Sequence, residues 1–146
     1  MQERMRMQEV APGGYRKVLE LNTYVQANVN PTLLELIKLR ASMVNGCAFC
    51  VDMHSADALK AGETSRRRLA LSAWTESPFF TEEERAALAL TDAVTRISEG
   101  GVPDQVWDAA RAIWSEKEVA DIVMAAIMIN AFNRIAISTR RLPEGA

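Results

Sequence analysis

Residues 31–54 read PTLLELIKLRASMVNGCAFCVDMH, and this stretch decides the fold and carries the chemistry. Asn30 and Pro31 predict a helix start, because asparagine suits the N-cap and proline suits the first helical position. The leucine-rich run that follows predicts a helix over 31–44 with a wide apolar face. Asn45-Gly46 ends it. A tight turn there makes the next helix pack beside this one.

Helical periodicity continues along the rest of the chain, whereas the alternation typical of strands is missing. Further helices are predicted over 15–28, 47–60, 64–74, 81–98, 102–114 and 115–139. Thr81 with Glu84, and Ser115 with Glu118, have the spacing of capping boxes. Pro12-Gly13-Gly14 is read as a helix breaker and 1–14 as a flexible N-terminal segment. No repeat or low-complexity linker is found, so 1–146 is predicted to be a single all-α domain of six to seven helices.

Composition narrows the class of function. Hydrophobic residues make up 49% of the chain and charged residues 25%, which is ordinary for a soluble globular domain. A formal net charge of −2 gives no general attraction to nucleic acid or anionic lipid. The N-terminus has no apolar core of a secretory signal, and the apolar stretch 122–129, interrupted at Asn130, is expected to be too short for a membrane span. We therefore expect a cytoplasmic protein, in which a close cysteine pair is catalytic or metal-binding and not a structural disulfide.

The two cysteines and the one histidine of the chain all fall within eight residues. On a helix, Cys47, Cys50 and His54 line one face. Free N–H groups at the helix start favour a thiolate and lower its pKa, which points to Cys47. His54 follows Cys50 by four residues and is within reach of its proton, which points to Cys50. We follow the histidine, because a specific base outweighs a dipole effect of roughly 0.3–1 kcal/mol.

Glu35 lies inside the run Leu33-Leu34-Glu35-Leu36-Ile37. A charge there is costly to bury without a partner. Since the two helices are expected to lie side by side, Glu35 is expected to face His54, directly or through water, and to tune its proton affinity.

The pattern Glu35, Cys47-x-x-Cys50, His54 resembles the signature of the AhpD-like alkylhydroperoxidases, in the carboxymuconolactone decarboxylase superfamily. The likeness extends through Ala61-Gly62-Glu63 and Arg85-Ala86-Ala87-Leu88 to Asn130-Ala131-Phe132-Asn133-Arg134. The best-characterised branch carries an additional histidine just before its second cysteine. This chain has Phe49 there, so its proton relay is shorter.

This resemblance implies an AhpD-like helical fold, a homo-oligomer (a trimer or a hexamer) and a thiol-dependent peroxidase. By position, Cys50 would be the peroxidatic cysteine, Cys47 the resolving cysteine, and Glu35 and His54 the proton relay. Cys50 would become a sulfenic acid, Cys47 would condense with it to a disulfide, and a dithiol protein or small dithiol would reduce that disulfide. No metal or organic cofactor is implied.

Three other readings stay open. Cys47, Cys50, His54 and Glu35 are chemically acceptable zinc ligands, although three of them lie on one helix. The second reading is a non-peroxidatic thiol–disulfide redox protein or a stress sensor. The third reading is the lactone decarboxylase branch of the superfamily, whose chemistry needs no cysteine pair.

Some residues near the motif and in the last helix have simpler expected roles. Core packing is favoured for Met43 and Met53 over a place in a substrate pocket. The polar Asn130, Asn133 and Arg134 of the last helix are expected to satisfy buried hydrogen bonds or subunit contacts.

Overall fold

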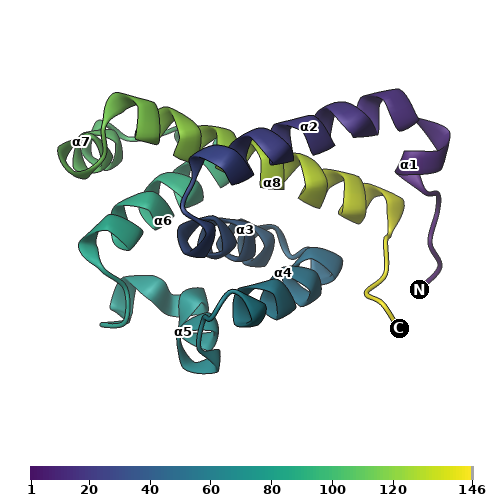
Figure 1. Cartoon of the computed structure of the whole chain (residues 1–146), viewed down its shortest axis with the longest axis horizontal. Helices are drawn as coiled ribbons and strands as arrows, with labels where there is room; N and C mark the ends of the chain where they lie inside the picture. The colour runs from purple at the N-terminus through teal and green to yellow at the C-terminus, as the bar shows by residue number, and fades with distance from the viewer. Residues whose placement is uncertain (146) are drawn as a thin grey trace.

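The computed structural model describes residues 1–145, and these residues form eight α-helices and one 3-10 helix with no strand (Figure 1). The elements are α1 (Met7–Val10), α2 (Pro12–Asn28), α3 (Pro31–Asn45), α4 (Ala48–Lys60), α5 (Ser65–Ala70), η1 (Leu71–Glu76), α6 (Glu82–Thr95), α7 (Asp104–Ile113) and α8 (Glu116–Thr139). The all-α prediction is confirmed, and the expected six to seven helices fall short of the eight observed.

Two of the predicted boundaries are wrong for identifiable reasons. Pro12-Gly13-Gly14 begins α2 and does not precede it, because a proline at the first helical position has no N–H to lose. The helix predicted over 64–74 divides into α5 and η1, with Ala73 at φ −124° and ψ 40° outside the helical region. The additional helix, α1, lies within the segment expected to be flexible, and that flexibility stays a prediction.

Helix α3 is bounded as its sequence predicts. The Asn30 side chain accepts hydrogen bonds from the N–H groups of Thr32 and Leu33, and Pro31 follows as the first helical residue. At the other end Gly46 has φ 67°, a left-handed conformation that glycine adopts without a steric penalty. The turn is therefore tight, and α4 returns alongside α3 (Figure 1).

Helix α3 is the central element, in contact with α4, α6 and α8. Its Leu34 and Ile37 belong to the larger apolar cluster, which α2, α6, α7 and α8 complete. Its Leu36 and Leu39 face a second cluster with Leu71, Trp74, Phe80 and Leu88. Burial of each such side chain contributes about 1.5–3 kcal/mol, so α3 is held on both sides.

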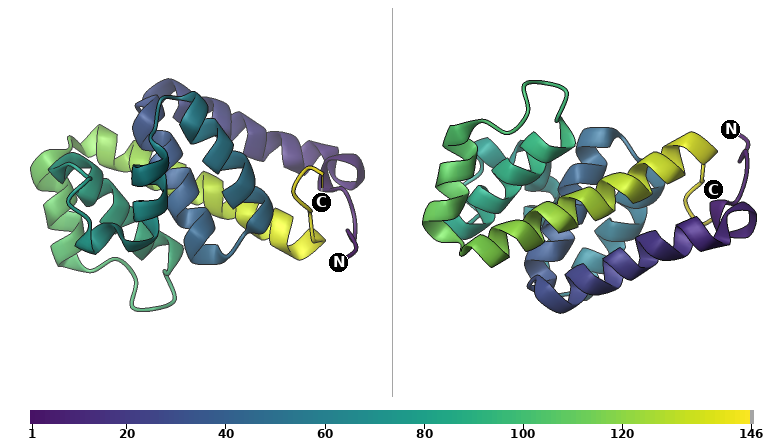
Figure 2. Two further views of the ribbon diagram at one scale, coloured as in Figure 1. Left: turned by 90° about the horizontal axis from the view of Figure 1, so that it is seen from below. Right: turned by 90° about the horizontal axis from the view of Figure 1, so that it is seen from above.

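Helix α8 crosses the whole molecule beside α2 (Figure 2). The apolar stretch that we expected to be too short for a membrane belongs to a continuous helix that is long and apolar enough to cross one by length and composition, with 50% of that window buried inside the molecule. Its buried Asp121, Asn130 and Asn133 hydrogen-bond to side chains of α2, α6 and α3 respectively. These contacts are those of the core helix of a globular domain.

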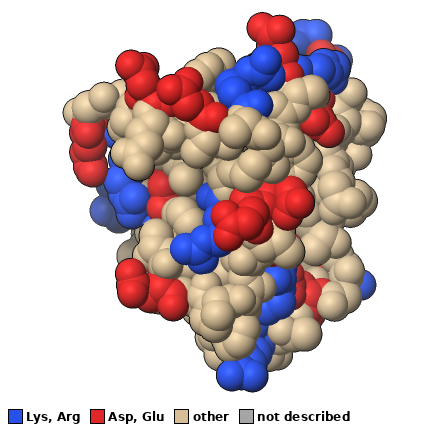
Figure 3. Space-filling view, turned by 90° about the vertical axis from the view of Figure 1, so that its left-hand side faces the viewer, with Lys and Arg blue, Asp and Glu red and all other residues tan. Residues whose placement is uncertain are grey.

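The two ends of the described chain meet at the end of α8 (Figure 2). The Arg4 N–H donates to the Thr139 carbonyl at 2.8 Å, and the Arg4 guanidinium donates to the Ser138 carbonyl at 3.1 Å. The face in Figure 3 mixes acidic and basic side chains without a patch of one sign, as a net charge of −2 leads one to expect.

Candidate active site

Cys47 and Cys50 lie at the start of α4, in contact with the last turns of α8. Cys47 is the N-cap residue and Cys50 the third residue of the helix, and both side chains are buried as free thiols. The two sulfur atoms are 2.6 Å apart. The Cys47 N–H donates to the Ser42 carbonyl at 3.0 Å, which fixes the entry of the chain into α4. A small movement would therefore close the pair into a disulfide, whose bond length is about 2.0 Å.

The two thiols are coupled through a hydrogen bond. The pKa of Cys47 falls to about 7, because the Cys50 thiol donates a hydrogen bond to an ionised Cys47 sulfur and the Cys50 backbone N–H adds a second, which together outweigh burial. The pKa of Cys50 is raised, because the same hydrogen bond holds its proton and because burial and the Cys47 charge disfavour a second anion. As pH rises through about 7, the pair therefore gains a single negative charge beside the first turn of α4.

Glu35 and His54 face one another across the α3–α4 interface, as their placement in the sequence led us to expect. The His54 Nδ1 atom lies 3.3 Å from Glu35 Oε2. Within residues 1–145 both atoms are buried and neither has a hydrogen-bond partner of good geometry, so their contact is a close approach of two polar atoms. Their contact is direct.

Lys38, one turn after Glu35, holds the second carboxylate oxygen. Its Nζ atom is 3.0 Å from Glu35 Oε1, and its side chain is 6% exposed. Burial alone would raise the pKa of Glu35, but the hydrogen bond from His54 and the Lys38 charge hold that pKa below its ordinary value. Glu35 therefore remains a carboxylate that orients His54.

Three potential cation ligands converge here, and the cysteines are not among them. Ligand atoms of Glu35, His54 and Asp57 lie within 4.8 Å of one another, with Asp57 Oδ2 at 4.0 Å from His54 Nδ1. The four-residue zinc set considered from the sequence is not the set that the fold gathers. A cation bound to these three groups would also meet the Lys38 ammonium, which already neutralises Glu35.

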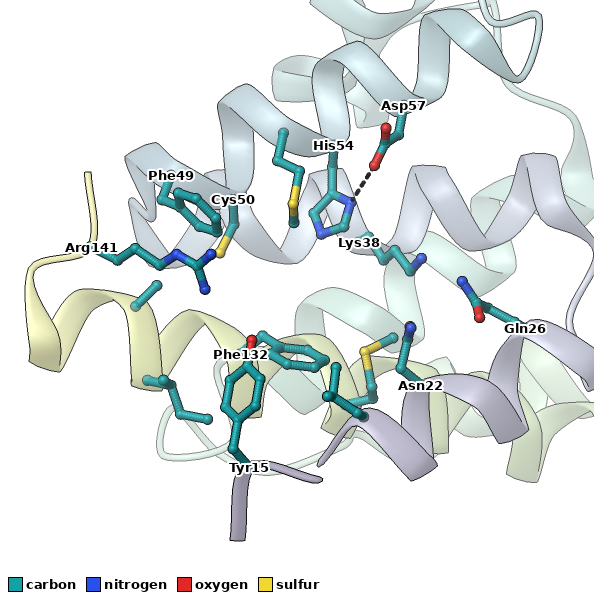
Figure 4. A pocket seen from close by; sticks show the side chains of 15 residues that line it. Tyr15, Asn22, Gln26, Lys38, Phe49, Cys50, His54, Asp57, Phe132 and Arg141 are labelled. Carbon is teal, nitrogen blue, oxygen red and sulfur yellow. Dashed lines mark ion pairs between the residues drawn. The ribbon is translucent and has the colours of Figure 1, made fainter. Parts of the chain in front are cut away.

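A cavity of about 270 Å³ opens between α4 on one side and α2 and α8 on the other (Figure 4). Cys50 and His54 line it from α4, and Tyr15 and Phe132 face them from α2 and α8. Most of its walls are apolar, and they include Leu19, Met53, Met128 and Ile135. Met53 thus lines a cavity, contrary to the expected core role, whereas Met43 does pack against the second core cluster.

Arg141 reaches the same cavity from beyond α8. Its guanidinium carbon lies 4.1 Å from the centre of the Phe49 ring, and Figure 4 shows it directed over that ring toward Cys50. Arg140 adopts a left-handed conformation with φ 55°, and the Arg141 N–H then donates to the Ala136 carbonyl at 2.9 Å. This helix-ending turn aims the Arg141 side chain back across the start of α4. The Arg141 cation therefore lies near Cys50, and it is stacked on the aromatic ring of Phe49.

An asparagine network ties the turn before Cys47 to α8. The Asn45 amide donates to the side-chain oxygens of Asn130 and Asn133 at 3.0 and 2.9 Å, and the Asn133 amide donates to Ser42 Oγ at 3.0 Å. Arg134 donates to Asn130 Oδ1 at 2.6 Å. The expectation that these polar residues of the last helix satisfy buried hydrogen bonds is confirmed.

The four residues singled out from the sequence lie in two neighbouring groups. Cys47 and Cys50 form one group and Glu35 with His54 the other, and Cys50 shares the cavity with His54. The sequence reasoning missed Lys38 and Arg141. Lys38 had a usable signal, since an i, i+3 pair with Glu35 places the two side chains together. Arg141 had none, because its place depends on how α8 crosses α4.

Comparisons with known proteins agree with this architecture. The carboxymuconolactone decarboxylase family matches residues 12–93, more than half of the chain. The uncharacterised protein YdfG of Bacillus subtilis (strain 168) is 42% identical over 139 residues, which cover 94% of this chain and 95% of that protein.

Two solved structures show how far the likeness extends. A protein of unknown function from Agrobacterium tumefaciens, suggested to be the antioxidant defence protein AhpD, superposes with a TM-score of 0.95 at 40% identity over 99% of this chain and 100% of that one. The debrominase Bmp8 superposes with a TM-score of 0.79 at 22% identity over 88% of this chain and 70% of that one, a likeness of fold alone. By sequence and by fold, the chain belongs to the carboxymuconolactone decarboxylase family and to its AhpD-like members.

Proposed function

We propose that this protein is a thiol-dependent peroxidase that reduces organic hydroperoxides through a Cys47–Cys50 disulfide cycle. The observation that carries the proposal is the pair of free sulfurs 2.6 Å apart, one of which opens with His54 into an apolar cavity. The pKa of Cys47, lowered to about 7 by the hydrogen bond from Cys50, supports a thiolate in the pair near neutral pH.

Cys50 is the proposed nucleophile, because it lines the cavity and Cys47 does not. Its proton passes to the Cys47 sulfur or to His54, which Glu35 orients. The Cys50 thiolate attacks the terminal oxygen of the hydroperoxide, the O–O bond breaks, and the departing alkoxide takes a proton and leaves as an alcohol. Cys50 is left as a sulfenic acid.

Cys47 completes the oxidative half of the cycle. Its sulfur attacks the sulfenic Cys50 sulfur, the S–O bond breaks, and the hydroxyl group leaves as water with one proton. A dithiol then reduces the disulfide by exchange and becomes a disulfide itself. Because the two sulfurs are only 2.6 Å apart, we expect this resolving step to outrun overoxidation.

The cavity indicates the class of peroxide. A space of about 270 Å³ with mostly apolar walls suits an organic hydroperoxide with an alkyl or aryl group better than hydrogen peroxide. We therefore expect cumene hydroperoxide to be consumed faster than hydrogen peroxide at equal concentration.

The test is peroxide consumption with a panel of dithiol donors, for the wild type and for Cys50→Ser. The variant is expected to lose turnover, and a variant that consumes peroxide as fast as the wild type would falsify the assignment. In Cys47→Ser, one added oxygen is expected on Cys50 by mass spectrometry after a single exposure to peroxide. Oxygen on Cys47 in Cys50→Ser, with none on Cys50 in Cys47→Ser, would reverse the two roles.

The same assays separate the alternatives. Disulfide exchange with dithiols in the absence of peroxide turnover would favour a thiol–disulfide redox protein or sensor. Turnover of a lactone substrate that survives loss of both cysteines would favour the decarboxylase branch. The cytoplasmic location and the trimer or hexamer stay predictions.

A further inference from the structure

A second cavity, also of about 270 Å³, lies on the other side of Phe49. Cys47 lines it, together with Ala48, Ile137 and Arg140. Phe49, Ala136 and Arg141 line both cavities, so these three side chains form the wall between them. This wall includes the Arg141 guanidinium stacked on the Phe49 ring.

Each sulfur therefore has its own cavity. Cys50 lines the first with His54, Cys47 lines the second, and neither cysteine lines both. The separation follows from the helix start, because Cys47 is the N-cap and Cys50 the third helical residue, with Phe49 between them on the chain. The cysteine pair thus lies between the two cavities, with one sulfur at each.

We infer that the second cavity is the binding site of the reductant, and that the reducing thiol attacks the sulfur of Cys47. This inference rests on the proposed function only in that the first cavity is assigned to the peroxide. Oxidant and reductant would then reach the same disulfide from opposite sides, without competing for one space.

The exchange balances in two steps. A thiolate of the reductant attacks Cys47 Sγ, the Cys47–Cys50 bond breaks, and Cys50 Sγ departs with the electron pair and takes a proton in the cavity that His54 lines. The second thiolate of the reductant then attacks its own sulfur in the mixed disulfide and releases the Cys47 thiolate. The reductant loses two electrons and becomes a disulfide, and the protein regains its thiol pair.

Cys50 is a competent leaving group in the mixed disulfide. In the free thiol pair its pKa is raised first by the hydrogen bond to Cys47 and also by the charge on Cys47. Both causes vanish once Cys47 is bonded to the reductant. Burial, which also raises the pKa of Cys50, remains, and so does the Arg141 charge, which lowers it.

The lining of the second cavity indicates the chemistry of the reductant. Arg140 and Arg141 supply two cations, and no acidic residue is among the described residues that line it. Met1, Ala48 and Ile137 supply apolar surface, and Gly46 also lines the cavity. The site fits a dithiol that carries a carboxylate better than a neutral dithiol.

Blocking each cavity separately tests the assignment. Ala48→Trp fills the second cavity from an exposed position, and Leu19→Trp fills the first from a residue that is 43% exposed. The two half-reactions are followed apart, as loss of free thiols on peroxide addition and as their return when the purified disulfide form meets dithiol. Ala48→Trp is expected to slow reduction of the disulfide by about tenfold and to leave oxidation by peroxide unchanged, because thiol exchange depends on access to the sulfur. Leu19→Trp is expected to slow oxidation by peroxide and to leave reduction unchanged. Equal slowing of reduction by both variants would overturn the inference.

A chemical trap reads the attacked sulfur directly. The disulfide form is prepared with diamide, so this experiment works even if the protein turns over no peroxide, and it is treated with a labelled monothiol. The label is expected on Cys47 by tandem mass spectrometry, and a label on Cys50 refutes the inference while leaving the peroxidase proposal intact.

A paired probe tests the charge of the reductant. Arg140→Asn keeps a residue that tolerates the left-handed conformation and removes the cation. Reduction by dimercaptosuccinate, a dicarboxylate dithiol, is expected to fall several-fold, whereas reduction by neutral dithiothreitol is expected to stay unchanged. An equal loss for both dithiols would argue against recognition of an anionic reductant.

Discussion

At the scale of single residues, the hydrogen bond between the two sulfurs shifts the pKa of each thiol. The pKa of Cys47, about 7, depends first on the thiol of Cys50. Replacement of that thiol in Cys50→Ala removes the hydrogen bond, so the pKa of Cys47 is expected to rise toward its ordinary value of 9.0. Since only the thiolate reacts, alkylation of Cys47 by iodoacetamide at neutral pH is expected to slow by about tenfold or more.

The measurement is the alkylation rate of Cys47 as a function of pH in the wild type and in Cys50→Ala. In the wild type the rate rises as pH increases through about 7, because the pair loses its first proton there. In Cys50→Ala the midpoint of this pH dependence is expected at a higher pH than in the wild type. An unchanged midpoint would show that the helix start, and not the neighbouring thiol, sets the pKa of Cys47.

Glu35 contacts both His54 and Lys38, and variants can separate the proposed proton relay from the structural ion pair. Glu35→Gln is expected to lower peroxide turnover by about 100-fold, since it removes the carboxylate that orients His54. It also leaves the buried Lys38 ammonium without its anion, which is expected to cost about 3–5 kcal/mol of unfolding free energy.

The double variant Glu35→Gln/Lys38→Met is the matched control, because it removes both charges. Its unfolding free energy is expected to return toward that of the wild type, as measured by urea denaturation, while turnover stays low. Recovery of turnover together with stability would mean that Glu35 acts only as a structural partner of Lys38.

At the scale of elements, the helices that the sequence predicts best are those with explicit end signals. Both capping boxes form, at Thr81 with Glu84 and at Ser115 with Glu118. The start of α2 was misplaced because Pro12 stops a preceding helix and begins a following one equally well, and only the packing of α2 on α8 decides between them. The type of each element is thus determined by local sequence, whereas some of its boundaries are determined by tertiary packing.

One contact joins α3, η1 and α6, and no nearby sequence pattern predicts it. Arg40 donates from Nε and Nη2 to the two oxygens of Asp92 at 2.7 and 2.8 Å, and Trp74 Nε1 donates to Asp92 at 3.1 Å. The residues are far apart in sequence and read as ordinary surface charges. Tertiary structure alone shows that the Arg40–Asp92 pair is largely buried.

Asp92→Asn is therefore expected to lower the unfolding free energy by about 3–5 kcal/mol, because Arg40 would remain buried without its anion. Urea denaturation measures this loss. Lys17→Ala is the matched control, since the Lys17–Glu20 pair is exposed and its removal is expected to change stability by less than about 1 kcal/mol. Equal losses in the two variants would show that burial of the Arg40–Asp92 pair has no consequence.

At the scale of the whole molecule, the part of the site that lies on one hairpin of helices could be predicted and the rest could not. Glu35, Cys47, Cys50 and His54 lie within twenty residues, so helix geometry and one tight turn are enough to bring them together. Arg141 and the two cavities depend on the course of α8 and of the chain beyond it. No local pattern encodes that course, because it results from the packing of α8 on five other helices, chiefly α2, α3 and α6.

Helix α8 also carries the prediction on assembly. Its central part is in the core, yet Ile127 and Ile137 remain 44% and 45% exposed in the single chain. Exposed aliphatic side chains on a half-buried apolar helix lead us to expect a contact with a second copy. Sedimentation velocity is expected to give the mass of three or six chains of 16.2 kDa, and a single-chain mass over the micromolar range would contradict it.

Ile127→Asp is expected to lower the mass, because a carboxylate in an apolar contact lacks a partner. Ile97→Asp, at a 55% exposed position beyond α6, is expected to leave it unchanged. An oligomer that survives Ile127→Asp would place the contact on a face other than that of α8.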